Sequence, residues 1–126
     1  MPITSWLVRE QDAVVVVSFH ETKIADLAAV QQLEKELQAV ALQAASGQKL
    51  LVDFSGVEFI SSMTIGLIVR LRGECKRAGI QLKLCSLSPN LSEAFRITGL
   101  RKVLEIYPDE IGAIDAFALP ALGSDI

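Results

Sequence analysis

Residues 51–66 read LVDFSGVEFISSMTIG, and the order of residue types in this stretch decides the fold. The apolar run at its start predicts a buried strand over 49–54. A Ser-Gly pair closes that strand, because both residues favour turns. Ser61 and Ser62 then stand where N-caps stand, which predicts a helix that runs to Ala78 and ends at a glycine. The stretch therefore reads as a strand, a short loop and a helix, as in α/β folds.

Before this stretch the sequence predicts two strands and a helix. The apolar segments Leu7–Val8 and Ala13–Phe19 are joined by the polar run 10–12, which suits a tight connection. The second segment is almost wholly apolar, so we expect an interior strand buried on both faces. Apolar residues recur every three or four positions over 27–44, which predicts an amphipathic helix with Gly47 as its stop.

After the stretch, the alternation over 80–84 predicts a strand with one wetter face, on which Gln81 and Lys83 lie. Three further elements follow: a helix opened by Ser88-Pro89 that stops before Gly99, a short strand over 103–106, and a helix opened by Pro108-Asp109-Glu110 that runs to about Phe117.

The resulting element order is ββαβαβαβα, which belongs to the α/β class. Strands separated by helices are expected to pair in parallel, whereas the first two strands, joined directly, form an antiparallel edge. We expect one domain over residues 1–126, with a core of about 5–118 and a frayed tail over 119–126.

The composition describes an aliphatic core and a weakly acidic chain. Hydrophobic residues make up 51% of the 126 residues, but aromatic residues only 6%. The 12 basic and 15 acidic residues give a net charge of -3, which argues against nucleic acid as a partner. The apolar runs are too short to span a membrane.

The scarce residue types exclude several kinds of chemistry. His20, Cys75 and Cys85 are too few for the usual zinc or soft-metal site, and the cysteines form no C-x-x-C pair. Neither simple glycine-rich nucleotide motif occurs, and no G-x-S-x-G surrounds a serine. We therefore expect no catalytic residues, no metal and no cofactor, and we expect both cysteines to be buried in a reducing cytoplasm.

Basic residues are concentrated in one segment. Five bases stand against one acid, Glu74, between positions 70 and 83; they are Arg70, Arg72, Lys76, Arg77 and Lys83. Two interpretations stay open. The segment is either a solvated helix face, as surface charge usually is, or a surface on which an acidic partner docks.

Ser61 and Ser62 are also open to two interpretations. A helix N-terminus carries free backbone N–H groups and the positive end of the helix dipole, so it either binds a phosphate or is capped by a hydroxyl. Phosphorylation there would add about two negative charges, which would order the first turn or repel a docked partner. An ordinary cap is the commoner role of serine at such a position.

A series of motifs resembles the STAS domain, the sulphate transporter and anti-sigma factor antagonist family. The motifs are DFSGV at 53–57, FISS at 59–62, RAG at 77–79, LKL at 82–84, LSP at 87–89 and FRITGL at 95–100. The resemblance extends from near Trp6 to near Ala116, and it implies a mixed sheet with helices packed on one side. Since no membrane span precedes or follows, the chain is more similar to the free-standing, cytoplasmic antagonists than to the tail of an anion transporter.

The resemblance implies a switch operated by another enzyme. In free-standing antagonists a serine at the start of the second helix is phosphorylated by the anti-sigma factor, a serine kinase of the histidine-kinase-like ATPase type. A phosphatase, which the resemblance implies to be metal-dependent, reverses this. The unphosphorylated form binds the anti-sigma factor and the phosphorylated form releases it. In this sequence the residue at the position of that serine is Ser62. In the usual pattern an aspartate stands at the position of Ser61 and a glycine at the position of Thr64. Ser61 and Thr64 are therefore alternative phosphate acceptors, and a site that is never phosphorylated is a further open alternative.

The resemblance also implies a partner-binding surface around this serine, made of the loop 59–62, the second helix and the 20–22 loop. The residues assigned to it are Asp53, Phe59, Ile60, Ser61, Ser62, Met63, Thr64, Gly66, His20 and Thr22. The sequence leaves open the identity of the sigma factor, the kinase and the phosphatase, and the oligomeric state.

Two alternatives compete with the switch. The first is a STAS scaffold without phosphorylation, or a module that binds a small apolar or nucleotide ligand. The second is a receiver domain with Asp53 as phosphate acceptor, but no acidic pair follows an early strand to hold Mg²⁺, and Tyr107 stands before Pro108 where a receiver has lysine. In the preferred interpretation Asp53 accepts a hydrogen bond that anchors the loop.

Overall fold

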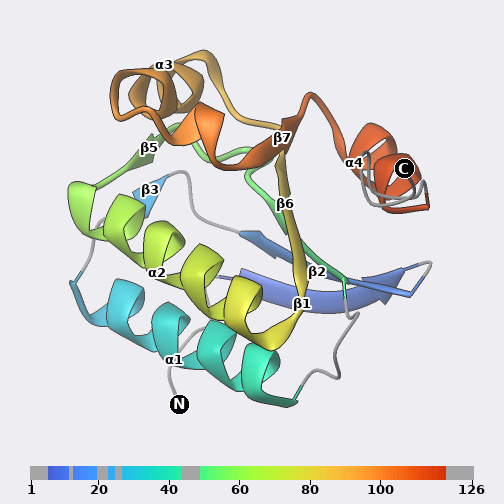
Figure 1. The fold of residues 1–126 in the computed structure, drawn as a ribbon. Helices are drawn as coiled ribbons and strands as arrows, with labels where there is room; N and C mark the ends of the chain where they lie inside the picture. The colour runs from blue at the N-terminus through green and yellow to red at the C-terminus, as the bar shows by residue number, and fades with distance from the viewer. Residues whose placement is uncertain (1–5, 12, 20–22, 25–26, 44–48, 119–126) are drawn as a thin grey trace.

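The computed structural model describes residues 6–11, 13–19, 23–24, 27–43 and 49–118. Their main feature is a five-stranded sheet in the order β1-β2-β4-β6-β7 (Figure 1). The strands are β1 (Trp6–Gln11), β2 (Val14–Phe19), β4 (Lys49–Asp53), β6 (Gln81–Cys85) and β7 (Glu105–Tyr107). Only β1 and β2 pair antiparallel, and the other neighbours pair in parallel. The α/β class and the mixed sheet are therefore confirmed.

The connections between these strands contain the helices and a second, smaller sheet. The helices are α1 (Leu27–Gln43), α2 (Ser62–Ala78), α3 (Pro89–Ile97), the single 3₁₀ turn η1 (Leu100–Lys102) and α4 (Glu110–Phe117). The short strands β3 (Lys23–Ile24) and β5 (Phe59–Ile60) pair in parallel beside the main sheet. The sequence pattern did not predict β3 or β5, because two residues are too few to show a period.

Helix ends lie where the capping residues predict them. Ser61 is the N-cap of α2, and Gly79 ends that helix in the left-handed conformation with φ 74°. Ser88 caps α3, which begins at Pro89 and ends before Gly99. The last strand begins at residue 105 instead of the predicted 103, because η1 and the turn after it take up the preceding residues. The predicted stop of α1 at Gly47 and the tail over 119–126 lie outside the described residues.

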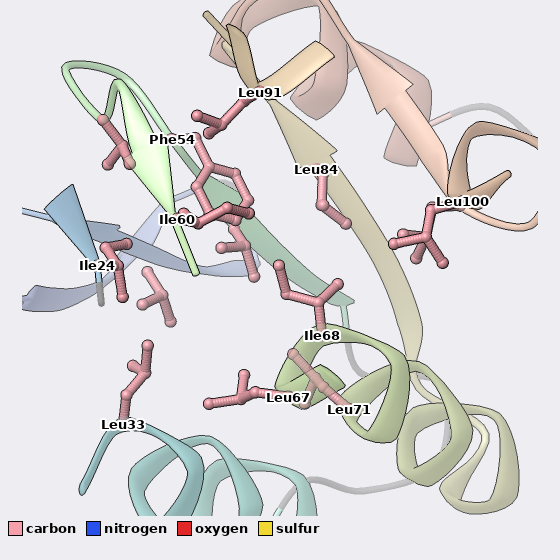
Figure 2. Close-up of a cluster of buried hydrophobic side chains, with 14 of the residues drawn as sticks. Ile24, Leu33, Phe54, Ile60, Leu67, Ile68, Leu71, Leu84, Leu91 and Leu100 are labelled. Carbon is pink, nitrogen blue, oxygen red and sulfur yellow. The ribbon is translucent and has the colours of Figure 1, made fainter. Parts of the chain in front are cut away.

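α1 and α2 pack together on one face of the main sheet. In Figure 2, Leu33 of α1, Leu67 of α2 and Leu84 of β6 point into the same apolar cluster. The ring of Phe54 closes this core near the end of β4. It stacks on Phe19 at a centroid distance of 5.4 Å and meets Phe95 edge-on at 6.4 Å. The aliphatic core expected from composition is thus present, with a few rings at its upper end.

The opposite face of the sheet is covered by α4, which corrects the placement of helices on one side only. Ala113 and Phe117 of α4 pack on apolar side chains of three strands, namely Val14, Val16, Leu51 and Cys85. The physical reason lies in β2, whose consecutive valines project apolar surface to both faces. Helices on one face alone would leave half of that surface in water.

Lys83 also departs from its prediction, because it is 5% exposed instead of lying on a wetter face. Its Nζ lies 2.9 Å from Oε1 of Glu105, and 5.3 Å and 5.0 Å from the ring centroids of Tyr107 and Phe117. Lys83 does alternate with Leu84, which packs in the cluster with α1 and α2, so Lys83 lies on the opposite face of the sheet. That face is buried there because α4 covers it, and an ion pair and two rings stabilise the ammonium group.

Candidate phosphorylation and partner-binding site

The loop after β4 is held by the carboxylate of Asp53. The backbone N–H of Ser55 donates to Asp53 Oδ1 at 2.9 Å, and the N–H of Val57 donates to the carbonyl of Phe54 at 2.9 Å. Gly56, at φ 83°, completes the turn in a conformation that glycine adopts at no steric cost. The loop-anchoring role predicted for Asp53 is confirmed, and its side chain is directed into the turn.

β5 brings the loop back to the main body and separates two neighbouring side chains. Phe59 pairs with Lys23 and Ile60 with Ile24 of β3. Successive residues of a strand face opposite sides, so Ile60 is buried while Phe59 is 52% exposed. An exposed phenyl ring costs solvation free energy, which makes Phe59 a candidate contact for a partner.

The first turn of α2 is tied to β3 through the two residues that depart from the family pattern. Oγ of Ser61 accepts from the N–H of Thr64 at 3.3 Å, and the two hydroxyl oxygens lie 3.1 Å apart. The carbonyl of Ile24 accepts twice, from Oγ1 of Thr64 at 2.7 Å and from the N–H of Ser61 at 3.1 Å. Both hydroxyls are therefore engaged inside the protein.

Ser62 differs from Ser61 and Thr64 because its side chain is exposed and makes no hydrogen bond to the described residues. It is the first residue of α2, where the positive end of the helix dipole and the free N–H groups of the first turn favour an anion. Met63 beside it is 41% exposed. The site thus presents an accessible hydroxyl, with the exposed apolar residues Phe59 and Met63 three positions before it and one position after it in the sequence.

The remaining predicted site residues divide by burial. Asp53, Ile60 and Thr64 are buried and shape the site from inside, whereas Ser61 and Gly66 are half-buried. A Cβ added at Gly66 would meet only Nη1 of Arg70, at 3.5 Å, so the helix does not require glycine there. His20 and Thr22 lie outside the described residues. Their described neighbours, Lys23–Ile24, pair with β5.

The carbonyl of Ile24 is the functional group that sequence reasoning missed. It accepts the hydrogen bonds that fix the start of α2, yet it is a backbone group 40 positions from Thr64 in the sequence. A threonine in place of the family's usual glycine was the available signal, since a buried hydroxyl requires an acceptor.

Cys85 lies beside Asp53, and Thr64 lines the small core cavity, so both adjoin the site from its buried side. Cys75 and Cys85 are buried, as expected, and burial raises the pKa of their thiols to about 11 and about 12. Among the described residues no three His, Cys, Asp or Glu side chains lie together as metal ligands do. The apolar cavity under Thr64, between Phe19 and Leu67, has about 10 Å³, room for one water molecule.

Comparison with known proteins identifies relatives of this arrangement. A family model described as the STAS domain matches residues 5–113. BtrV of Bordetella bronchiseptica, named as an anti-sigma factor antagonist, is 29% identical over 100 residues, which are 77% of this chain and 84% of BtrV. No helix within the described part of the chain is long and apolar enough to cross a membrane.

Solved structures agree with this assignment. An anti-sigma factor antagonist (STAS) domain protein from Planctomyces limnophilus superposes with a TM-score of 0.83 at 30% identity, covering 90% of this chain and 98% of that one. Unphosphorylated SpoIIAA gives 0.74 at 18% identity, covering 92% and 99%. The phosphorylated form of SpoIIAA, from Bacillus, gives 0.69 at 20% identity, covering 88% and 97%. At these identities the SpoIIAA structures support the fold alone.

Proposed function

This chain belongs to the STAS domain family and is similar to anti-sigma factor antagonists, and we propose that it binds an anti-sigma factor and is switched by phosphorylation of Ser62. The observation that carries the proposal is the state of Ser62, which is exposed, without a hydrogen-bond partner among the described residues, and at the start of α2. The protein is then a regulatory adaptor whose chemistry is supplied by other enzymes.

The geometry favours Ser62 over the two alternative acceptors. Thr64 is 1% exposed and its hydroxyl is bonded to a carbonyl, so a kinase would reach it only after the first turn of α2 opened. Ser61 uses its hydroxyl oxygen as the helix cap, and its phosphorylation would remove that cap. Ser62 requires neither change.

A phosphate on Ser62 would act through local electrostatics. A partner that covers Ser62 together with the exposed side chains of Phe59 and Met63 would have to desolvate the dianion, which carries about two negative charges. The free N–H groups of the first turn would stabilise the same phosphate in the unbound protein. Both effects favour release, while the unmodified serine leaves the apolar contact intact.

The partners follow from the family. We propose that the anti-sigma factor is a serine kinase of the histidine-kinase-like ATPase type, that a metal-dependent phosphatase restores Ser62, and that all three proteins meet in the cytoplasm. The similarity to BtrV and to the Planctomyces limnophilus protein supports the anti-sigma factor as binding partner. SpoIIAA, which shares this fold, has been solved in unphosphorylated and phosphorylated forms, and the transfer of that modification to Ser62 is part of the proposal.

The test uses a serine kinase of the histidine-kinase-like ATPase type from the same organism, sought first among the products of neighbouring genes. Incubation with this kinase and ATP should add one phosphate to the parent protein and to Ser55→Ala, a control at another exposed serine, but none to Ser62→Ala. Intact-mass spectrometry measures this. Ser62→Asp should bind the kinase about tenfold or more weakly in a calorimetric titration, the effect of one uncompensated interfacial charge.

Two results would contradict the proposal. Unchanged phosphate uptake by Ser62→Ala would place the acceptor elsewhere. Binding of Ser62→Asp as tight as that of the unmodified protein would show that charge at this position does not control the partner, and would leave the scaffold alternative.

A further inference from the structure

A cleft opens at the far end of α2 from Ser62, and it has no part in the proposed switch. We name it the basic cleft. It encloses about 210 Å³ and is lined by Arg72, Cys75 and Lys76 of α2, by residues 80–82 at the start of β6, and by residues 103–105 between η1 and β7.

The cleft exists because β7 is shorter than β6. β7 pairs with the last three residues of β6 and leaves Gln81 and Leu82 without a partner on that side. Buried side chains of Cys75, Ile80 and Leu104 form an apolar floor, and Val103, 47% exposed, forms one wall. An exposed aliphatic side chain on such a wall is surface that a partner can cover.

The unneutralised charge at the cleft is positive, although the chain as a whole carries -3. Lys76 is exposed and has no ion-pair partner among the described residues. Arg72 uses only its Nε, which donates to the carbonyl of Val103 at 2.8 Å. Glu105, the one acid among the lining residues, has its carboxylate paired with Lys83, its register partner on β6. Arg70, one turn before Glu74 on α2, is paired with Glu34, whereas the exposed bases Arg77 and Lys102 adjoin the lining residues Lys76 and Val103.

We propose that the basic cleft binds an acidic segment of a partner protein, with one aliphatic side chain seated between Val103 and Leu82. Carboxylates on either side of that side chain would meet Arg72 and Lys76. The volume is below the roughly 300–1,000 Å³ of small-molecule pockets and suits one anchoring side chain of a protein surface. An apolar anchor with charged flanks combines affinity with orientation.

This docking is independent of the proposed switch. Arg72 follows Ser62 by ten positions on α2, a separation of about 15 Å along the helix axis. Phosphate at Ser62 lies beyond a Debye length of about 8 Å at physiological ionic strength. The acidic partner therefore binds both states of Ser62, and failure of either proposal leaves the other standing.

The test is an NMR titration of the full chain with a capped peptide, Asp-Glu-Leu-Glu-Asp. Amide resonances of Arg72, Gln81, Leu82 and Val103 should shift in a saturable way at millimolar peptide, while those of Ser62 and Met63 stay in place. The peptides Asp-Glu-Ser-Glu-Asp and Lys-Lys-Leu-Lys-Lys should bind at least about tenfold more weakly, because one lacks the anchor and the other the charge.

Matched variants locate the contact. Lys76→Glu should weaken peptide binding about tenfold, whereas Arg77→Glu, an equal charge change at a neighbouring exposed residue outside the cleft, should change it less than about twofold. Val103→Asp should abolish binding, whereas Val69→Asp, at an equally exposed valine of α2 outside the cleft, should not. The amide spectra of the variants also report whether each is folded.

Three results would overturn the proposal. Equal losses from Lys76→Glu and Arg77→Glu would mean unspecific attraction to a basic helix. Shifts of the same size and position with succinate would indicate a small-molecule carboxylate site instead of a protein-docking site. The absence of cleft shifts at millimolar peptide would mean that the cleft binds no acidic segment.

Discussion

Thr64 lies in the first turn of α2 with its side chain turned inward, and its Oγ1 donates to the carbonyl of Ile24 while its N–H is capped by Ser61. This one side chain joins the start of the helix to β3, so it determines how firmly Ser62 and its neighbours are presented. Glycine, the usual residue of the family at this position, would provide no such link. The unusual residue therefore has a structural role at the site.

Thr64→Val should destabilise the protein by about 1–3 kcal/mol, because it leaves the site's volume filled but removes a buried hydroxyl donor from its acceptor. Urea denaturation measures this. Thr98→Val is the matched control, since Thr98 also donates to a backbone carbonyl, at 2.9 Å, but in an exposed position. A loss of stability from Thr98→Val as large as that from Thr64→Val would contradict the special role of Thr64.

The thiols of Cys75 and Cys85 give a prediction about pH. Burial raises their pKa values from 9.0 to about 11 and about 12, so between pH 9 and 11 the unfolded chain loses protons that the folded chain keeps. Their contribution to stability is complete below pH 9 and is lost as pH rises through 11. The free energy of unfolding should fall by up to about 1.4 kcal/mol per pH unit for each thiol.

Denaturation between pH 8 and 11, on the parent and on Cys75→Ser/Cys85→Ser, measures this slope. The double variant removes both thiols and leaves every other side chain of the protein in place. Parallel pH profiles for the two proteins would refute the assignment of the slope to the cysteines.

At the scale of elements, the sequence pattern predicts where α4 begins and ends but does not predict how it packs on the sheet. The final helix, its opening near Asp109 and its end at Phe117 were all predicted from local signals. The face of the sheet on which α4 packs was not predicted, because β2 and β4 carry apolar side chains on both faces and no local pattern distinguishes the two faces. The position of α4 explains why Lys83, in an alternating strand, is buried.

Glu105→Gln should destabilise the protein by about 1–3 kcal/mol, because it removes the anion that accompanies a buried ammonium group. Lys83→Met should cost less, since a residue of similar length and no charge can fill the same space between Tyr107 and Phe117. Urea denaturation of both variants decides the order. If Lys83→Met were the more damaging change, the ion pair and the cation–π contacts would be net stabilising.

At the scale of the whole molecule, two neighbouring phenylalanines show how the fold separates stability from binding. Phe54 is enclosed between Phe19 and Phe95 in the main core, and Phe59 stands exposed five residues later. The turn held by Asp53 lies between them. The same short segment therefore supplies one ring to the core and one to the surface around Ser62.

Phe54→Ala should lower the free energy of unfolding by about 3–5 kcal/mol, whereas Phe59→Ala should change it by less than about 0.5 kcal/mol. Binding to the anti-sigma factor should behave in the opposite way, because Phe59→Ala removes exposed apolar contact area and leaves the fold intact. Denaturation and calorimetric titration test the two halves separately. A Phe59→Ala variant that binds with unchanged affinity would remove this ring from the proposed surface.

The sequence by itself determined the local chemistry of this protein. Sequence periods and capping residues report directly on contacts within a few residues. Such contacts determine strand 49–53, the capping serines Ser61 and Ser88, the stop at Gly79 and the family pattern around Ser62. Only the tertiary structure decided what long-range contacts control. These are the face that α4 covers, the burial of Lys83 and Thr64, the carbonyl of Ile24 as a double acceptor, and the basic cleft beside a strand that β7 pairs incompletely. Each joins segments distant along the chain, and no local pattern carries that information.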